Sequence, residues 1–307
     1  MSADVSARPD AGDGAAAARP TDLPADPAAD EAAHAADARA REAAALPVRA
    51  WVEHHMGMPW SVHVRGDAAH DPRTAAAVER AFARVAALDA ELSPFRADSA
   101  LNRLRRGELA LAAAPDALRA VHARCLAARD ATGGAFDAWG WRDGFDPTGL
   151  SKGWSVDHVL GLLSALDADV AVGAGGDVGV RSASGLPWRV GVEDPADRGR
   201  LLAHVDLLDG GVATSGTAAH GGHVVDQRTG GPVWGVRSAT VVAADVVTAD
   251  VWATTAMVLG PAEAPARLAA LPGTRGVLVT ADGTVHRWAT PPDARAAGTR
   301  GVTAARW

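Results

Sequence analysis

Apolar positions change their spacing along the chain, and each spacing predicts a type of element. Between residues 48 and 66, apolar and polar residues alternate on both sides of Gly57, which predicts two paired strands. Over residues 71–92, apolar side chains recur at helical spacing, and Asp71 or Thr74 is placed to cap that helix. We therefore expect the ordered chain to start with a strand pair and an amphipathic helix.

The same criteria predict further elements. Helices are expected over residues 114–131, 151–166, 247–259 and 262–271, and closing strands over 275–280 and 284–288. The stretch between the second and third of these helices alternates short strands with glycine-rich turns. Because many connections are short enough for hairpins, we predict an α+β fold with mixed or antiparallel sheets and packed helices. A helix followed by several strands occurs twice, which predicts two similar halves.

Composition divides the chain into three segments. Residues 1–46 are rich in Ala, Pro and Asp, and we expect a disordered tail in which residues 30–45 form at most a polar helix with no packing partner. Residues 47–290 form the predicted globular domain, and residues 291–307 a C-terminal tail. No secretory signal, lipidation cysteine or membrane-spanning apolar run is visible, so we expect a cytoplasmic location and no membrane segment.

The charge balance and rare residues narrow the function. The net charge is −7 and the basic residues are spread along the chain, which argues against a nucleic-acid-binding protein. Cys125 is the only cysteine, which excludes an internal disulfide and a Cys-rich zinc site. Lys152 is the only lysine and Asn102 the only asparagine, a skew typical of GC-rich coding. Apart from chance, a lone lysine indicates a position where the broader arginine does not serve.

The segment FDPTGLSKGWSVD carries the first candidate chemistry. It places Asp146, Gly149, Lys152 and Asp157 at a predicted loop-to-helix junction. Free N–H groups at a helix start, a glycine that lets a ligand approach and a lysine on the first turn together indicate a phosphate site. The alternative is an ordinary helix start with a solvated lysine.

The segment VVTADVWATTAMVLG carries the second. Asp250 and Thr254 are one helical turn apart, so both side chains point the same way. A carboxylate and a hydroxyl are oxygen donors of the kind that Mg²⁺ prefers. The alternative is that Asp250 caps the first turn and Thr254 bonds back to its own helix.

Two glycine-rich stretches carry weaker signals. His220, His223 and Asp226 lie among glycines, where a histidine is accessible and titrates near neutral pH. Metal binding by these histidines alone is not favoured, because a third ligand of suitable spacing is missing. The stretch VGAGGDVGV leads into another strand instead of a helix, so we interpret it as a tight turn in which Asp177 accepts from backbone donors.

Nine segments in order resemble the ApbE family, the flavin transferases that take FMN from FAD and attach it to a protein. The matching segments, which lie between Met56 and Gly260, are MGMPWSVHV, LSPFRADSAL, GGAFD, DPTGLSKGWSVD, VGAGGDV, WRVGVEDP, VATSG, HVVDQRTGGPV and ADVWATTAMVLG.

The resemblance implies an ApbE-like fold with its two halves around a flavin site, and assigns roles to particular residues. It implies Mg²⁺ held by Asp250, Thr254 and the backbone oxygen of Gly149, with His223 as general base. It implies FAD contacts from Met56, Phe95, Ala135, Phe136, Asp137, Asp146, Lys152 and Val225.

The implied reaction is attack by a Thr or Ser hydroxyl of an acceptor protein on the FMN phosphorus of FAD, with loss of AMP. The acceptor would carry a short motif resembling Asp-Gly-x-Ser/Thr-Gly-Ala-Thr. Two alternatives remain open at this point: hydrolysis of FAD to FMN and AMP, and FAD binding without turnover. Intact His223, Asp250 and Thr254 argue against the second alternative, because storage needs no base.

Four positions depart from the family pattern. Residues 217–219 lack the usual aromatic after TSG, and Gln227 stands where proline is usual. Arg105 replaces a frequent asparagine, and Phe95 stands where tyrosine is common. The implied metal and base positions are intact, so these departures bear on flavin contact more than on catalysis.

Overall fold

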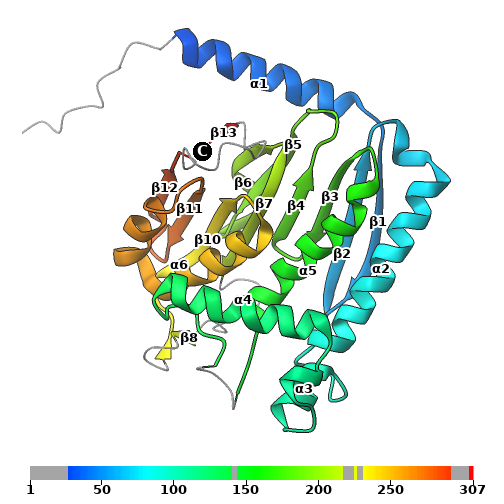
Figure 1. Cartoon of the computed structure of the whole chain (residues 1–307). Helices are drawn as coiled ribbons and strands as arrows, with labels where there is room; N and C mark the ends of the chain where they lie inside the picture. The colour runs from blue at the N-terminus through cyan, green and yellow to red at the C-terminus, as the bar shows by residue number, and fades with distance from the viewer. Residues whose placement is uncertain (1–26, 140–143, 217–224, 227–230, 292–303, 307) are drawn as a thin grey trace, which may run out of the picture.

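An eight-stranded antiparallel sheet runs through the middle of the molecule (Figure 1). The computed structural model describes residues 27–139, 144–216, 225–226, 231–291 and 304–306. The strands follow one another across the sheet as β1 (Val48–His55), β2 (Met58–Arg65), β3 (Asp169–Ala174), β4 (Asp177–Arg181), β7 (Asp209–Gly216), β10 (Val236–Ala243), β11 (Arg275–Thr280) and β12 (Val285–Ala289).

The sheet consists of two halves with the same order of elements. In the first, β1 and β2 are followed by a helical segment that ends in α5 (Thr148–Leu162), and then by β3 and β4. In the second, β7 and β10 are followed by helix α6 (Val246–Ala269) and then by β11 and β12. Pairing of β4 with β7 joins the halves, and α5 and α6 pack against each other in front of that seam. The predictions of an α+β fold with antiparallel pairing and of two similar halves are confirmed.

Helices cover one face of the sheet. Besides α5 and α6, this layer contains α2 (Pro72–Leu92), α3 (Ala100–Arg105), α4 (Asp116–Thr132) and the 3-10 turns η1 (Asp67–His70), η2 (Leu111–Ala113) and η3 (Leu163–Ala165). Asp71 caps α2 by accepting from Arg73 N over 2.7 Å, and α4 ends at Gly133 in the left-handed conformation. Both ends agree with the sequence signals. No helix in the described ranges is long and apolar enough to cross a membrane.

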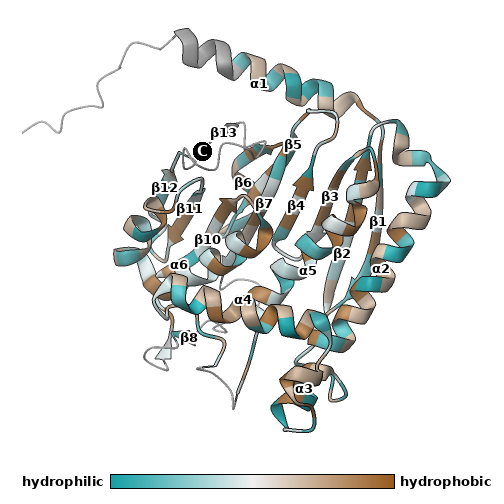
Figure 2. Ribbon diagram, viewed as in Figure 1, coloured by the Kyte–Doolittle hydropathy of each residue, from teal (hydrophilic) through white to brown (hydrophobic). Residues whose placement is uncertain are grey.

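A smaller sheet covers part of the opposite face. It is built from β5 (Trp188–Asp194), β6 (Asp197–Leu207) and β13 (Ala304–Arg306). Val205 and Leu207 of β6 share a buried cluster with Val212 and Val242 of the large sheet. The central strands are therefore covered on both faces, and every residue of β10 except Arg237 is buried. Figure 2 shows apolar residues along these strands. A two-stranded pair, β8 (Val225–Asp226) and β9 (Gly231–Pro232), lies apart from both sheets.

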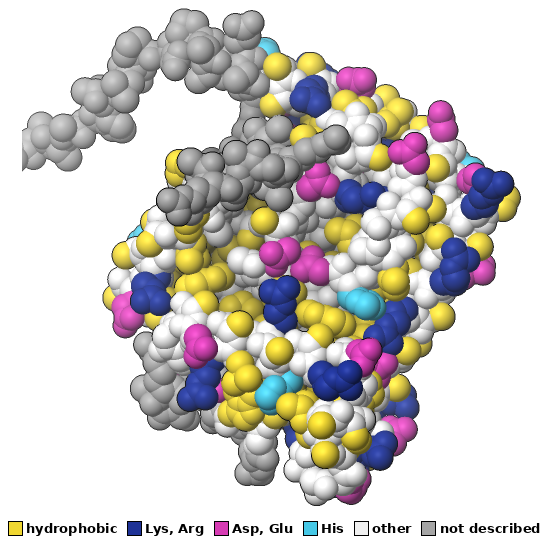
Figure 3. All heavy atoms as spheres, in the orientation of Figure 1, with side chains coloured by type: hydrophobic (Ala, Val, Ile, Leu, Met, Phe, Trp, Pro, Cys, Tyr) yellow, Lys and Arg dark blue, Asp and Glu magenta, His cyan; other side chains and the backbone are white. Residues whose placement is uncertain are grey.

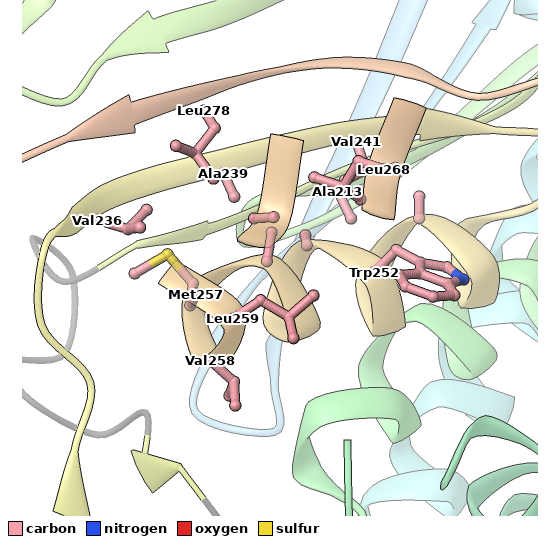
Figure 4. Packing of buried hydrophobic residues seen from close by; sticks show 14 of the residues in the cluster. Ala213, Val236, Ala239, Val241, Trp252, Met257, Val258, Leu259, Leu268 and Leu278 are labelled. Atoms are coloured by element: carbon pink, nitrogen blue, oxygen red, sulfur yellow. The ribbon is translucent and has the colours of Figure 1, made fainter. Parts of the chain in front are cut away.

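Helix α6 lies over the second half of the sheet. Figure 4 shows Met257 beneath the strands that carry Ala239 and Leu278, and all three side chains are fully buried. Gly260 has φ 71° and interrupts the helix, so the 247–259 and 262–271 helices of the sequence analysis are two arms of one bent element.

The structure corrects the expectation for residues 27–46. Helix α1 (Pro27–Ala45) contacts β5. Ala40 and Ala43 are buried, the Arg39 guanidinium donates to the Gly185 carbonyl, and Asp37 lies 3.4 Å from Arg189. Small alanines let the helix approach closely, and its charged residues find partners on β5 and the turn before it. Within the expected C-terminal tail, the three residues of β13 pair with β6.

Candidate functional site

Helices α5 and α6 meet through two glycines of α5. A Cβ on Gly153 would lie 2.9 Å from both Asp250 Cβ and the Val246 carbonyl oxygen, which is closer than atoms pack. A Cβ on Gly149 would lie 3.1 Å from the Phe136 ring. Glycine at 153 is therefore what brings the backbone of α5 against α6, and glycine at 149 leaves room for the Phe136 ring beside Thr254.

Asp250 is the centre of the helix contact. Its Oδ2 accepts a hydrogen bond from Gly153 N over 3.0 Å, and its Oδ1 lies 3.4 Å from Lys152 Nζ. Lys152 also forms an ion pair with Asp177, which is the first residue of β4 after the turn from β3. Asp177 is fully buried and Asp250 nearly so. One lysine thus bridges two buried carboxylates from different elements.

Burial and mutual proximity shift the pKa values of these groups. Burial, together with the Asp250 charge, raises the pKa of Asp177 well above its usual range, although Lys152 opposes the shift. Burial alone would lower the pKa of Lys152, but Asp250 and Asp177 outweigh it and raise that pKa. Lys152 therefore stays charged between the two carboxylates.

Asp157, one helical turn from Gly153, fixes the start of α6. Its Oδ1 accepts from Val246 N over 3.0 Å and its Oδ2 from Val247 N over 2.9 Å. Burial raises the pKa of Asp157 to about 6, against the lowering effect of these two hydrogen bonds. The position of α6 relative to α5 is thus held by a side chain as well as by glycine packing.

The three implied metal ligands come together at the same contact. Thr254 lies one turn after Asp250, and the Cβ position of Gly149 is 3.8 Å from Thr254 Oγ1. Ser215, at the end of β7, places its Oγ 3.2 Å from Thr254 Oγ1. Among the described residues, no group of three or more His, Cys, Asp or Glu side chains is arranged to hold a metal. The donors present are hard oxygens with one carboxylate, which fits Mg²⁺ completed by phosphate oxygens and water.

The implied flavin contacts after α4 lie close to this cluster. Ala135 and Phe136 are buried, and Phe136 N donates to Thr132 Oγ1 over 3.0 Å. Asp137 accepts from Trp139 N over 2.9 Å and lies 3.3 Å from Arg129 Nε. The aromatic ring of Phe136 faces Gly149, so this segment borders the start of α5.

Asp146 lies two residues before α5 and bonds to the first residue of the helix. Its Oδ1 accepts from Thr148 N over 3.1 Å, and its Oδ2 lies 3.5 Å from an Arg105 guanidinium nitrogen. The helix begins at Thr148 and not at Ser151, with Pro147 in the N-cap position. Lys152 consequently lies on the second turn, which corrects its predicted place on the first.

Phe95 lies in the loop between α2 and α3, and Met56 lies in the turn between β1 and β2. Phe95 is 83% exposed, and the loop that carries it is held by Asn102, whose Nδ2 donates to the carbonyls of Pro94 and Arg96 over 2.9 and 2.8 Å. Met56 has φ 53°, an unusual value for a residue with a side chain, and packs against the cluster that contains Phe136. Met56 therefore packs against the buried core of this region, whereas the Phe95 ring is left exposed.

Two predicted positions are not placed in full. His223, like His220, lies outside the residues that the structure describes. Val225 belongs to β8, and only its backbone is described.

The sequence assigns the wrong partner to one residue of the site region and no role to two others. The sequence predicts that Asp177 accepts from turn backbone, but its side chain meets Lys152. It assigns no role to Ser215 or Asn102, although Asn102 is the only asparagine in the chain. As the lone residue of its type, Asn102 carries the same sequence signal as Lys152.

The charge pattern of the helix-bearing face is mixed. Figure 3 shows acidic and basic side chains interspersed over this face, without a continuous basic stripe. Fold and site together define an antiparallel α+β protein with a lysine-bridged pair of carboxylates where its two halves meet.

Comparisons with known proteins identify the family. The model of the ApbE family matches residues 56–139 and 143–278, and the chain belongs to this family. An FAD:protein FMN transferase of Escherichia coli strain K12 is 33% identical over 132 residues, which cover 39% of this chain and 38% of that protein. One from Rhodobacter capsulatus is 36% identical over 153 residues, covering 46% of this chain and 28% of that protein. The chain thus spans well under half of these relatives' length.

Solved structures share the fold over a longer stretch. The ApbE protein of Thermotoga maritima superposes with a TM-score of 0.68 at 22% identity, covering 79% of this chain and 97% of the other. The flavin transferase ApbE of Vibrio cholerae gives a TM-score of 0.66 at 21% identity, covering 80% and 98%.

Proposed function

We propose that this protein transfers FMN from FAD to a Thr or Ser hydroxyl of an acceptor protein and releases AMP, with Mg²⁺ at the site. The observation that carries the proposal is the convergence of Gly149, Asp250 and Thr254 on one contact between α5 and α6. Membership of the ApbE family supports it, as do relatives named FAD:protein FMN transferase.

In this proposal the Gly149 carbonyl, Asp250 and Thr254 hold the metal. When bound, Mg²⁺ would offset the negative charge of the FAD pyrophosphate. Asp250 is aimed before any ligand arrives, because Gly153 N bonds to one of its oxygens and Lys152 Nζ lies beside the other. Such a fixed carboxylate needs no reorganisation to bind a cation.

The remaining implied residues bind FAD and move one proton. The FAD contacts would come from Met56, Phe95, Ala135, Phe136, Asp137, Asp146, Lys152 and Val225. His223 would accept the proton of the acceptor hydroxyl on a ring nitrogen as the new oxygen–phosphorus bond forms. The phosphorus–oxygen bond to AMP breaks in the same displacement, so FMN stays on the acceptor.

The test is a product analysis on the full chain. Purified protein is incubated with FAD, Mg²⁺ and an acceptor domain carrying the Asp-Gly-x-Thr-Gly-Ala-Thr motif, and the products are separated by mass spectrometry and chromatography. We expect the acceptor mass to rise by one FMN unit and AMP to appear in equal amount. A control acceptor with valine in place of both threonines of the motif stays unmodified.

Two results would overturn the proposal. Free FMN with AMP and an unmodified acceptor identify a hydrolase. FAD that binds and is recovered intact identifies a protein that only holds the flavin.

A further inference from the structure

Among the described residues, strand β1 is an edge of the large sheet that no other strand covers. It is the first strand in the sheet order, and six of its eight residues are exposed. Its register with β2 runs without a bulge from Val48 to His55, and it contains no proline or lysine. The opposite edge, β12, is only five residues long, and Pro291 lies two residues after its end. Natural sheets normally block a long edge with such features, and an edge that lacks them can pair with another strand.

The hairpin turn determines which backbone groups are free on that edge. Met56 and Gly57 form a two-residue turn, so the adjoining pair His55 and Met58 exchanges hydrogen bonds, and every second pair thereafter does the same. The residues between, which are Val48, Ala50, Val52 and His54, therefore direct their N–H and C=O groups away from β2. Pro59, which has no N–H, stands opposite His54, as a pair without hydrogen bonds requires.

The sequence of β1 complements itself in one antiparallel register. With Trp51 on a two-fold axis, Ala50 of one copy pairs with Val52 of the other, and their outward N–H and C=O groups meet. Arg49 of each copy then stands directly opposite Glu53 of the other. Shifting the register by two residues in either direction removes both pairings, because Arg49 would meet Trp51 or His55 instead.

The exposed apolar residues of β1 fit the same arrangement. Val52 is 60% and Val48 46% exposed on the face away from the helices. Pairing places Val52 beside Ala50 of the second copy and forms an apolar strip across the join. On the helix side, the Arg49 guanidinium already lies over the Trp51 ring at 4.6 Å, which holds its charge near the axis.

We propose that this protein forms a symmetric dimer in which β1 pairs antiparallel with β1 of a second copy. The two large sheets become one continuous sheet, with Trp51 facing Trp51 across the axis. The partner is a second copy of this chain, because the register that satisfies the backbone also brings Arg49 opposite Glu53 twice.

Analytical ultracentrifugation of the full chain tests the charge pairing. We expect wild type to sediment at about twice 31.3 kDa. Glu53→Arg places like charges opposite each other at both pairs and should weaken dimerisation at least about tenfold. The charge-swapped Arg49→Glu/Glu53→Arg protein should restore it. Arg287→Glu on the other edge strand, β12, is the matched control and should leave the dimer intact.

Disulfide trapping tests the register. Facing residues of a pair without hydrogen bonds lie close enough for a cross-strand disulfide, so Trp51→Cys should give a covalent dimer under mild oxidation. Glu53→Cys should not, because position 53 faces Arg49 of the second copy. The native Cys125 is fully buried and does not compete.

Three results would overturn the proposal. The first is a wild-type protein that stays monomeric at all concentrations, and the second is failure of the charge swap to restore association. The third is a covalent dimer from the Glu53→Cys protein with none from the Trp51→Cys protein.

Discussion

The backbone N–H of Gly153 donates to Oδ2 of Asp250 over 3.0 Å, so the two helices that carry the candidate site are joined by a hydrogen bond within it. This bond forms because Gly153 has no side chain to separate α5 from α6. The orientation of the Asp250 carboxylate therefore depends on the packing of α5 against α6 as well as on the Asp250 rotamer.

Adding a methyl group at Gly153 should disturb both stability and site. In Gly153→Ala the new Cβ would meet Asp250 Cβ and the Val246 carbonyl at 2.9 Å, and we expect a loss of about 1–3 kcal/mol in the free energy of unfolding. Gly161→Ala on the same helix is the control, since nothing lies within 4 Å of its Cβ position. It should stabilise by roughly 0.5–1 kcal/mol. Chemical denaturation measures both, and equal effects would contradict the packing role.

Removing the Asp250 carboxylate should abolish activity and its metal dependence. We expect Asp250→Ala to lose FMN transfer and to show no response to Mg²⁺, because the one carboxylate of the implied ligand set is gone. Transfer to the acceptor domain is measured across a Mg²⁺ titration. Glu263→Ala, an exposed change on α6, serves as the control. A wild-type Mg²⁺ response in Asp250→Ala would refute the metal assignment.

Lys152 should matter because it bridges two buried carboxylates. Lys152→Met leaves Asp177 and Asp250 without their cation, and removal of one partner from a buried ion pair typically costs about 3–5 kcal/mol. The Lys152 side chain is partly exposed, so we expect the lower end of that range. Adding Asp177→Asn to Lys152→Met removes one of the stranded charges and should recover much of the loss. Urea unfolding of the single and double variants checks this, and additive effects would show that the residues act independently.

Asp157 should make stability depend on pH in a defined direction. Its pKa is raised by burial from 3.8 to about 6, so the folded chain holds the proton more tightly than the unfolded chain. Its contribution is thus complete below about pH 4 and is lost as pH rises through 6. The unfolding free energy of wild type, minus that of Asp157→Asn, should fall between about pH 4 and 7. A difference that stays constant or rises would show that the Asp157 pKa is not raised.

His223 should affect turnover more than binding. We expect His223→Ala to bind FAD with near-wild-type affinity, because the proposed role is proton removal, and to lose most transfer. Flavin fluorescence gives the affinity, and acceptor labelling gives the rate. A folded His223→Ala protein that binds no FAD would show that His223 contacts the flavin nucleotide and would contradict its assignment as the general base.

Elements with local signals were predictable from the sequence. The β1–β2 hairpin, the Asp71 cap and the glycine end of α4 each depend on a few neighbouring residues, and all three are present. The packing of helix α1 was not, because alanines that lie closely against β5 give no strong apolar periodicity.

The candidate site was predictable only in part. The turn spacing of Asp250 and Thr254, and the ApbE resemblance, named groups that the fold brings together. Asp177 was placed wrongly because its partner, Lys152, is distant in sequence and meets it only when the β3–β4 turn folds against α5. No local pattern encodes such a contact.

The seam between the two halves has a consequence for fragments of this protein. Gly149, Lys152 and Asp177 come from the first half, whereas Asp250 and Thr254 come from the second. Neither fragment alone contains both the lysine and the proposed metal-binding carboxylate, and β4 would lack its partner β7. We therefore expect proteolysis between β4 and β7 to give two fragments that are each inactive. Activity would return only if the fragments reassociate, so it would measure the fraction of intact or reassembled protein.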